Sequence, residues 1–283
     1  MSGLSKEILT VPISSKRRPE MLMLSFGSSR QVRLRKQCTK ADFFVGYWIQ
    51  ISGATVVAAA EIKAGRFGEA SDKSYDDLRD EKEVGSLISA NPARVVDNLA
   101  SQEPTTVRTA LVVGPLIYGE GSGPVNKRSI QAPEITRLTL QRKKGLRIGR
   151  GLNIWSNVHI HDLGNLLLAL FEAAVSESSA VWNQNGVYFP ENGKLSFGDL
   201  SKNIVPEARK QNLLETEEIE EITAEEANSL SAHAAATWGT NAILTSSRAQ
   251  AQLHWSPSGV SLLEEIPEIV RSEAKAIVSR STL

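Results

Sequence analysis

Apolar residues lie in short β-rich runs that are separated by longer stretches with helical spacing. The runs 47–51 and 107–113 contain β-branched and aromatic residues and end at Ser-Gly and Gly-Pro pairs, which predicts two buried strands. Between them, the apolar positions of residues 78–99 recur at the spacing of one helix face. Strand, helix and strand in this order predict a βαβ unit and therefore a parallel sheet.

The carboxyl-terminal half continues this alternation with a larger share of helix. A short strand is predicted over 158–160, and Asp162 is predicted as the N-cap of the strongly apolar helix that follows. The acidic segment 215–226 is predicted to form the solvated face of a helix. Further helices are predicted over 133–144, 200–205 and 262–277.

These elements predict an α/β fold with a Rossmann-type parallel sheet and a smaller carboxyl-terminal α/β substrate lobe. Compared with the family resemblance that is described below, the amino-terminal βα units of that sheet are expected to be missing or degenerate. Three regions are predicted. Residues 1–46 form a basic segment that is disordered or atypical, residues 47–125 form a residual Rossmann-type core, and residues 126–283 form the substrate lobe, which returns to the core at about 155–190.

Composition excludes several classes of partner. The 283 residues are 41% hydrophobic and carry a formal net charge of zero, which favours neither nucleic acid nor an anionic membrane as a partner. No apolar run is long enough to cross a bilayer. The single cysteine, Cys38, cannot form an intramolecular disulfide and is typical of a reducing compartment. A cytoplasmic protein with a small-molecule substrate is the expectation that follows.

The neutral total conceals a basic amino-terminal segment. Residues 1–46 contain nine Lys or Arg and three acidic residues, a local net charge of +6. An organelle transit peptide would have such a composition, and so would a tail without a targeting role.

Candidate binding chemistry lies in the polar loop that follows the second strand. Asn126, Arg128 and Ser129 supply hydrogen-bond donors suited to a phosphate or carboxylate. His159 and His161 alternate along the predicted strand, so we expect them on opposite faces and predict no metal site.

Four segments in order resemble one known family. They are IQISG at 49–53, GPLIYG at 114–119, NVHIHDL at 157–163 and LHWSP at 253–257. The chain is thereby similar to the extended short-chain dehydrogenase/reductase superfamily, which contains nucleotide-sugar epimerases and dehydratases. The segments GPVNKRSIQAPE at 123–134 and WGTNA at 238–242 resemble a fungal branch of atypical NAD(P)-binding oxidoreductases within it.

The resemblance implies an NAD(P)-dependent oxidoreductase or epimerase-like enzyme acting on a small hydroxyl or carbonyl compound, with NAD or NADP as cofactor. It implies catalytic Ser52, with Tyr75 or a water as the group that exchanges the proton and Arg79 as the cation beside Tyr75. The implied cofactor-binding residues are Ser52, Gly53, Gly114, Pro115 and Tyr118. The implied substrate-binding residues are Asn126, Arg128, Ser129 and His159.

Two departures from the family pattern keep alternatives open. The sequence has no G-x-x-G-x-x-G loop, and the position four residues after Tyr75 is Arg79 rather than the family's lysine. A catalytically inactive NAD(P)-binding or regulatory protein, or a truncated and non-functional family member, would show the same departures. A homodimer through the helix predicted within 77–99 is a further expectation.

Overall fold

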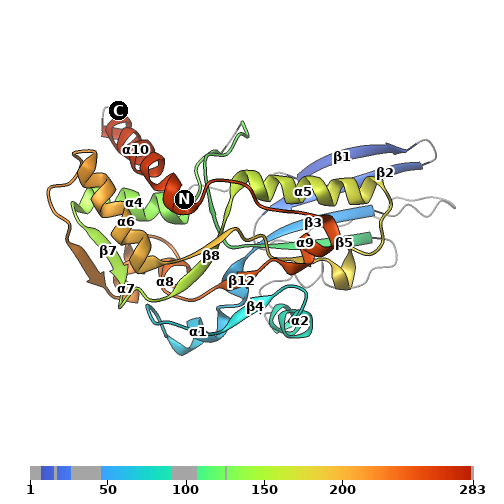
Figure 1. Cartoon of the computed structure of the whole chain (residues 1–283), viewed down its shortest axis with the longest axis horizontal. Helices are drawn as coiled ribbons and strands as arrows, with labels where there is room; N and C mark the ends of the chain where they lie inside the picture. The colour runs from blue at the N-terminus through green and yellow to red at the C-terminus, as the bar shows by residue number, and fades with distance from the viewer. Residues whose placement is uncertain (1–7, 16–17, 27–45, 91–106, 125, 282–283) are drawn as a thin grey trace.

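The structure, a computed structural model, describes residues 8–15, 18–26, 46–90, 107–124 and 126–281 (Figure 1). Its largest sheet has five strands in the order β1-β2-β3-β5-β9. These strands are β1 (Ile8–Ser15), β2 (Arg18–Phe26), β3 (Gly46–Gly53), β5 (Val107–Gly114) and β9 (Val187–Tyr188). β1 and β2 form an antiparallel hairpin, and every later pairing in the sheet is parallel. The predicted α/β fold with a parallel sheet is confirmed.

The amino-terminal segment differs from the disordered tail that was one expectation. Its described parts, residues 8–15 and 18–26, are strands. Backbone pairing of β2 with β3 makes them part of the main sheet. Pro12 lies on β1, the edge strand, which is where a sheet tolerates proline.

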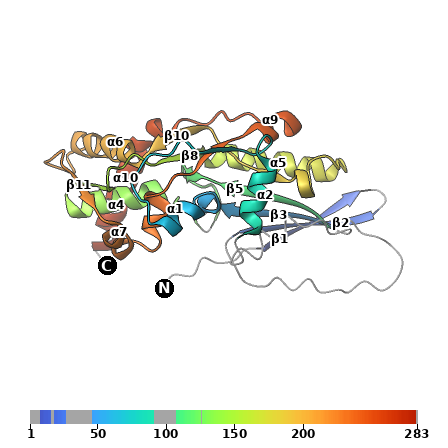
Figure 2. The same ribbon diagram turned by 90° about the horizontal axis from the view of Figure 1, so that it is seen from below.

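The central strands alternate their side chains between two apolar layers. Ala110 and Val112 of β5 pack with Leu166 and Leu170 of α5 (Ile160–Val175) in one cluster of buried residues. Leu111 and Val113, the intervening residues, belong to a second cluster that contains Val84 and Ile88 of α2 (Glu81–Ser89). Helices α5 and α2 accordingly lie on opposite faces of the sheet (Figure 1 and Figure 2).

Smaller sheets and further helices complete the molecule. The order β10-β8-β6 makes a three-stranded sheet, and β11 pairs with β7, and β12 with β4, in parallel. Helix α10 packs against α4 and α6. The strands are β4 (Ser74–Asp76), β6 (Leu116–Tyr118), β7 (Gly145–Ile148), β8 (Ile154–His159), β10 (Gly193–Ser196), β11 (Ile219–Ile222) and β12 (Ile243–Thr245). The helices are α1 (Ala59–Ala64), α4 (Gln131–Arg142), α6 (Phe197–Lys210), α7 (Ala224–Leu230), α8 (Ala234–Trp238), α9 (Ser247–Leu253) and α10 (Leu262–Ser281), with short 3₁₀ turns at Ala54–Val56 and Asn183–Asn185.

The helix predicted over 78–99 begins later than expected. Asp76 accepts hydrogen bonds from the backbone N–H groups of Leu78 and Arg79, at 2.9 and 2.8 Å, and so holds a turn ahead of α2. Aspartate competes with helix formation in this way because its short side chain satisfies the local backbone. Residues 91–99 lie outside the described part of the chain, and the homodimer expected through this helix stays a prediction.

The acidic segment 215–226 is a strand at its centre, so the predicted solvated helix is wrong there. Residues Ile219–Ile222 form β11 and pair in parallel with β7. Their acidic side chains lie beside basic ones of the neighbouring strand and helix: Glu220 pairs with Arg142 and Lys144. The backbone pairing and the opposite charges together override the helical appearance of the acidic run.

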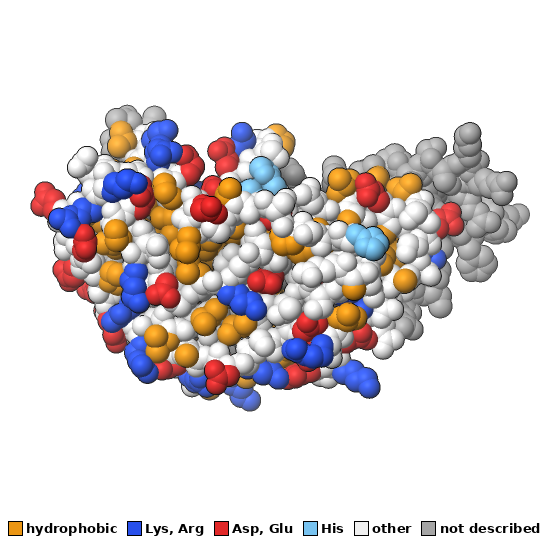
Figure 3. Space-filling model, in the orientation of Figure 1, with side chains coloured by type: hydrophobic (Ala, Val, Ile, Leu, Met, Phe, Trp, Pro, Cys, Tyr) orange, Lys and Arg blue, Asp and Glu red, His pale blue; other side chains and the backbone are white. Residues whose placement is uncertain are grey.

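Charges of both signs are mixed on the surface. On the face drawn in Figure 3, Lys and Arg lie among Asp and Glu without a large field of one sign. Among the described residues, no helix has the length and apolarity that a membrane crossing requires.

Candidate functional site

A cavity of about 390 Å³ opens where β3 and β5 end. In the parallel pair, Ser52 lies opposite Val113 and Gly53 opposite Gly114, so both strands end at one edge of the sheet. Ligands of open α/β sheets bind at such an edge, and the volume lies within the usual range for small-molecule sites. The lining is completed by the 115–131 segment and the start of α5, through Ile160 and Leu163.

The cavity brings together most of the residues that the sequence singled out. It is lined by Ser52, Gly53, Gly114, Pro115, Asn126, Arg128 and Ser129. Tyr118 and His159 do not line it, although the neighbours of Tyr118, Ile117 and Gly119, do. Their roles in binding a cofactor or substrate stay predictions.

Two glycines shape this edge for different reasons. At Gly53 a Cβ atom would find open space within 4 Å, so the backbone borders the cavity directly. Gly119 has a φ of +88°, and its Cβ would lie 2.6 Å from Nε2 of His159. Only glycine allows that backbone conformation together with that close approach, which accounts for the Tyr-Gly pair at the turn.

Tyr118 is fully buried behind the turn. Its hydroxyl donates to the backbone oxygen of Val260, at 2.6 Å, and lies 3.1 Å from Oδ1 of Asn192. Burial raises the pKa of Tyr118 to about 12. The side chain therefore ties β6 to the 254–261 segment as a neutral phenol.

Asp162 is not the helix cap that was predicted. The N-cap of α5 is His159, whose Nδ1 accepts a hydrogen bond from the backbone N–H of His161 at 3.2 Å. The carboxylate of Asp162 instead accepts from the backbone N–H groups of Ser258 and Gly259 and from Nδ2 of Asn192. A carboxylate that is 1% exposed is thus used to hold a distant segment against the start of α5.

His159 and His161 also differ from expectation, because they do not lie on opposite faces of a strand. His159 ends β8, whereas His161 is already in the first turn of α5, so the two-residue alternation stops between them. Their rings meet edge to face with centroids 4.7 Å apart. Within the part of the chain that the structure describes, no group of three or more metal-ligating side chains is gathered.

The predicted proton donor and its cation do not line the cavity. Tyr75 lies in β4, paired with β12, and burial raises its pKa, whereas a proton donor activated by a cation would have a lowered one. Arg79 is mostly exposed and binds Asp80 at 2.8 Å. The geometry gives the pair no support as a catalytic dyad.

The same segment contributes a buried node that sequence analysis missed. Asp77 is 1% exposed and accepts hydrogen bonds from the backbone N–H groups of Phe189, Ser247 and Arg248. The fully buried Arg248 donates in turn to the backbone oxygen of Asp77 and to Glu81. These hydrogen bonds fix α9 and Phe189 to the turn before α2. The local sequence around Asp77 and Arg248 does not indicate that the two residues meet in the interior.

Asp77 gives the fold a specific pH dependence. Burial raises its pKa from 3.8 to about 6, although the three N–H donors act in the opposite direction. The folded state therefore holds this proton more tightly than the unfolded chain, and the associated stability is present below pH 4 and lost as the pH rises to about 6. The free energy of unfolding should fall by about 2–3 kcal/mol over that interval relative to Asp77→Asn, measured by urea denaturation. Parallel pH profiles for the two proteins would contradict this.

The cavity fits one end of a dinucleotide better than the whole of it. The open side of Gly53, beside Gly114 and Pro115, leaves room for a flat ring against the strand ends. A strand, glycine-rich loop and helix that could bind the pyrophosphate is not among the described residues ahead of β3, which form the β1–β2 hairpin.

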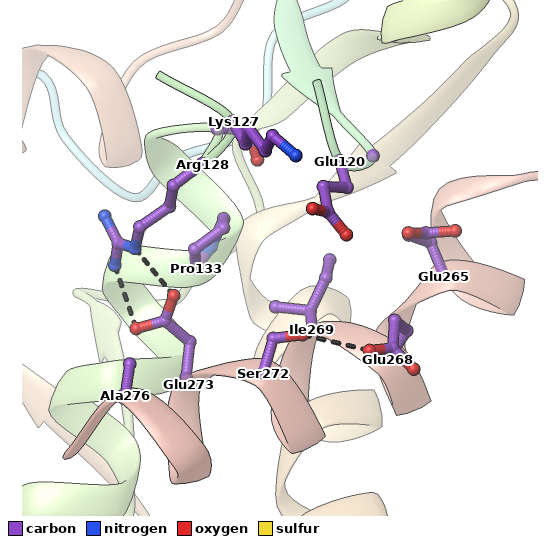
Figure 4. A pocket seen from close by; sticks show the side chains of 12 residues that line it. Glu120, Lys127, Arg128, Pro133, Glu265, Glu268, Ile269, Ser272, Glu273 and Ala276 are labelled. Atoms are coloured by element: carbon purple, nitrogen blue, oxygen red, sulfur yellow. Dashed lines mark hydrogen bonds and ion pairs between the residues drawn. The ribbon is translucent and has the colours of Figure 1, made fainter. Parts of the chain in front are cut away.

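Arg128 lines the cavity but is already bound to protein carboxylates. Its guanidinium contacts Glu273 of α10 at 2.6 Å (Figure 4) and Glu134 of α4 at 3.1 Å. The sequence predicted that Arg128 binds an anionic group of the substrate. In the structure, the carboxylates of Glu273 and Glu134 neutralise the positive charge that would attract this group.

Comparison with known proteins gives one close relative and many structural neighbours. Oxidase ucsJ of the fungus Acremonium sp is 34% identical over 244 residues, which cover 82% of this chain and 70% of ucsJ. No model of a protein family matches the chain.

The PbgP3 protein of Burkholderia pseudomallei superposes with a TM-score of 0.54 at 11% identity, over 83% of this chain and 66% of that one. The UDP-glucuronic acid 4-epimerase of Bacillus cereus, solved with UDP-glucuronic acid and NAD, gives a TM-score of 0.49 at 15% identity, over 81% of this chain and 62% of that one.

The sequence identity to ucsJ bears on the family of this chain, whereas the superposition on PbgP3 bears on its fold alone. The relation to ucsJ covers most of both proteins, and PbgP3 shares the fold. The chain spans less than two thirds of the length of either solved structure.

Proposed function

We infer that this chain, which belongs to the same family as the fungal oxidase ucsJ and has the fold of the extended short-chain dehydrogenases/reductases, is an NAD(P)-dependent oxidoreductase or epimerase-like enzyme. Its substrate is a small hydroxyl or carbonyl compound. The name of the relative supports redox chemistry, and the fold supports a nicotinamide cofactor.

One observation carries the proposal: the only predicted catalytic serine and the two predicted cofactor glycines line one cavity at the carboxyl edge of the sheet. Ser52 and Gly53 reach it from β3, and Gly114 reaches it from β5, about 60 residues further along the chain. Convergence of these positions at a strand edge is the arrangement that a nicotinamide and a substrate oxygen require.

The residues that would hold the nicotinamide end of the cofactor are Gly53, Gly114 and Pro115. When bound, NAD or NADP supplies a hydride acceptor or donor. Backbone at Gly53 can approach a flat ring without an intervening side chain, whereas the side chain of Ile117 already packs against Gly114. The choice between NAD and NADP stays open.

Ser52 is the side chain that would orient the reacting oxygen. Ser52 lies at the end of β3 and lines the cavity, where its hydroxyl would hydrogen-bond an alcohol or carbonyl oxygen. Because Tyr75 does not line this wall, water takes the place of a side chain in exchanging the proton. Asn126 and Ser129 supply further hydrogen-bonding side chains of the lining for the substrate.

Replacing Ser52 with alanine should reduce turnover by about 10²-fold with a smaller change in cofactor affinity. Turnover is followed by NADPH and NADH absorbance against a panel of aldehydes, ketones and secondary alcohols. Ser86→Ala, an equal change at an exposed position of α2, is the matched control and should leave turnover unchanged. Equal rates for wild type and Ser52→Ala would remove Ser52 from the reaction.

A second function is favoured by the absence of Tyr75 and Arg79 from the cavity wall. A protein that binds NAD(P) without turnover, as a sensor or regulatory subunit, needs the cavity but not a proton donor. It would bind the cofactor and show no turnover over the panel, and Ser52→Ala would then alter affinity alone.

A further inference from the structure

A second cavity, of about 270 Å³, lies on the other side of the 119–129 loop, against α10. Its floor is apolar and consists of Pro133, Ile269 and Ala276. Around the open side stand the carboxylates of Glu120, Glu265 and Glu268 (Figure 4). Four residues line both cavities, so the loop is a wall common to the two: Gly119, Lys127, Arg128 and Ser129.

Arg128 is fixed in this wall by carboxylates from two helices. Nε donates to Oε1 of Glu273 at 2.6 Å, and Nη2 donates to Oε2 of Glu273 and to Oε2 of Glu134, each at 3.1 Å. Glu273 is 5% exposed, and Glu134 is also bound by Arg137. The Nε–Nη2 edge of the guanidinium is therefore filled by Glu273, and Nη2 is shared with Glu134.

An anionic group entering this cavity would have to compete with those carboxylates. Freeing Arg128 would leave Glu273 buried and without its cation, which is strongly unfavourable for an ionised carboxylate. The remaining cation of the described lining, Lys127, is exposed. The same lining contains Glu120 and Glu265, whose charges repel an anion, and Glu268, which pairs with Arg271. The apolar floor, in contrast, favours a hydrocarbon surface.

We propose that Arg128 is a positioning and specificity residue rather than an anion contact. Held by Glu273 and Glu134, it fixes the wall between the cavities and makes the α10 cavity a subsite for an uncharged, largely apolar part of the substrate. Groups that carry phosphate or carboxylate are excluded there. That the α10 cavity holds part of a substrate rests on the proposed function, whereas the exclusion of anions from it does not. A nucleoside diphosphate sugar would, on this account, not place its diphosphate in the α10 cavity.

The test removes the carboxylate that holds Arg128 and then measures the binding of an anion. Inorganic pyrophosphate and UDP are titrated by calorimetry into the wild type, Glu273→Gln, and Glu273→Gln combined with Arg128→Met. Wild type should bind neither probe at the α10 cavity. Glu273→Gln should gain at least about tenfold in affinity, because a bidentate donor becomes available, and the double variant should lose that gain.

Two controls separate this effect from a change of charge or of folding. Glu268→Gln removes the same charge from the same lining but leaves Arg128 bound, so it should gain little. Glu134→Gln frees Nη2 from Glu134 only and should give a smaller gain if Glu273→Gln fails to fold. Wild-type binding of either probe that Arg128→Met abolishes would overturn the proposal, and so would no gain in the folded release variants. Cofactor titration in the same proteins tests the proposed function separately.

Discussion

Replacing Arg248 with methionine is expected to lower the free energy of unfolding by about 3 kcal/mol, one of the two largest effects that the structure predicts. Arg248 is fully buried, and its guanidinium has hydrogen-bond acceptors within the protein. Nε and Nη2 donate to the backbone oxygen of Asp77, and Nη2 also donates to Glu81 at 2.7 Å. Methionine fills much of the volume but leaves that buried oxygen unpaired and Glu81 without its cation.

Urea denaturation measures this loss, with Arg271→Met as the matched control. Arg271 pairs with Glu268 on the surface of α10, where both side chains are about half exposed, so its removal should cost less than about 1 kcal/mol. Because Glu81 keeps 30% of its side-chain surface, its unpaired charge is partly solvated, and most of the expected cost comes from the Asp77 oxygen and the lost packing. Equal losses in the two variants would show that burial of Arg248 does not matter.

Asp162→Ala should destabilise the protein by a similar amount, about 3 kcal/mol, and loosen one segment in particular. The carboxylate is 1% exposed and accepts hydrogen bonds from the backbone of Ser258 and Gly259 and from Asn192. Alanine leaves these three donors without their acceptor in a partly buried site, and the loss of three hydrogen bonds to one carboxylate carries the expected cost. Trp255 remains bound to the backbone oxygen of Asp162, which limits the damage to the tip of the segment.

Hydrogen exchange resolves the second part of this expectation. The amides of Ser258 and Gly259 should lose protection in Asp162→Ala while those of β5 keep theirs after correction for global stability. Asp199→Ala is the control, because Asp199 is half exposed and pairs with Lys202 on the surface of α6. Retained protection at 258–259 would mean that the carboxylate does not hold the segment.

The position of the candidate site could be predicted from sequence because it depends on where strands end. Two apolar runs stopped by Ser52-Gly53 and Gly114-Pro115 predicted buried parallel strands, and parallel strands related by a crossover end at one edge. In the structure, the β3–β5 register places Gly53 opposite Gly114. Predicting that these strand ends meet required only the positions of the two strands and not the packing of their side chains.

The partners of individual side chains could not be predicted, because they come from distant parts of the chain. Arg128 and Glu273 are 145 positions apart, and the local sequence around Arg128 shows only a cluster of donors. Asp162 precedes an apolar helix and so has the pattern of an N-cap, but His159 caps the helix and the carboxylate serves the 258–259 backbone. Tyr75 had the spacing of a catalytic tyrosine, whereas pairing of β4 with β12 fixes it in a strand.

The central claim is that a nicotinamide cofactor binds where β3 and β5 end, and direct titration of NADPH and NADH by fluorescence tests it. Wild type should bind at least one of them with micromolar affinity. Gly53→Leu should weaken binding by at least about tenfold, since its side chain would enter the open space at Gly53 without displacing protein atoms. Gly164→Leu, at an exposed position of α5 that is equally open, should bind as wild type does. No binding at millimolar cofactor, or equal binding by wild type and Gly53→Leu, would contradict the account.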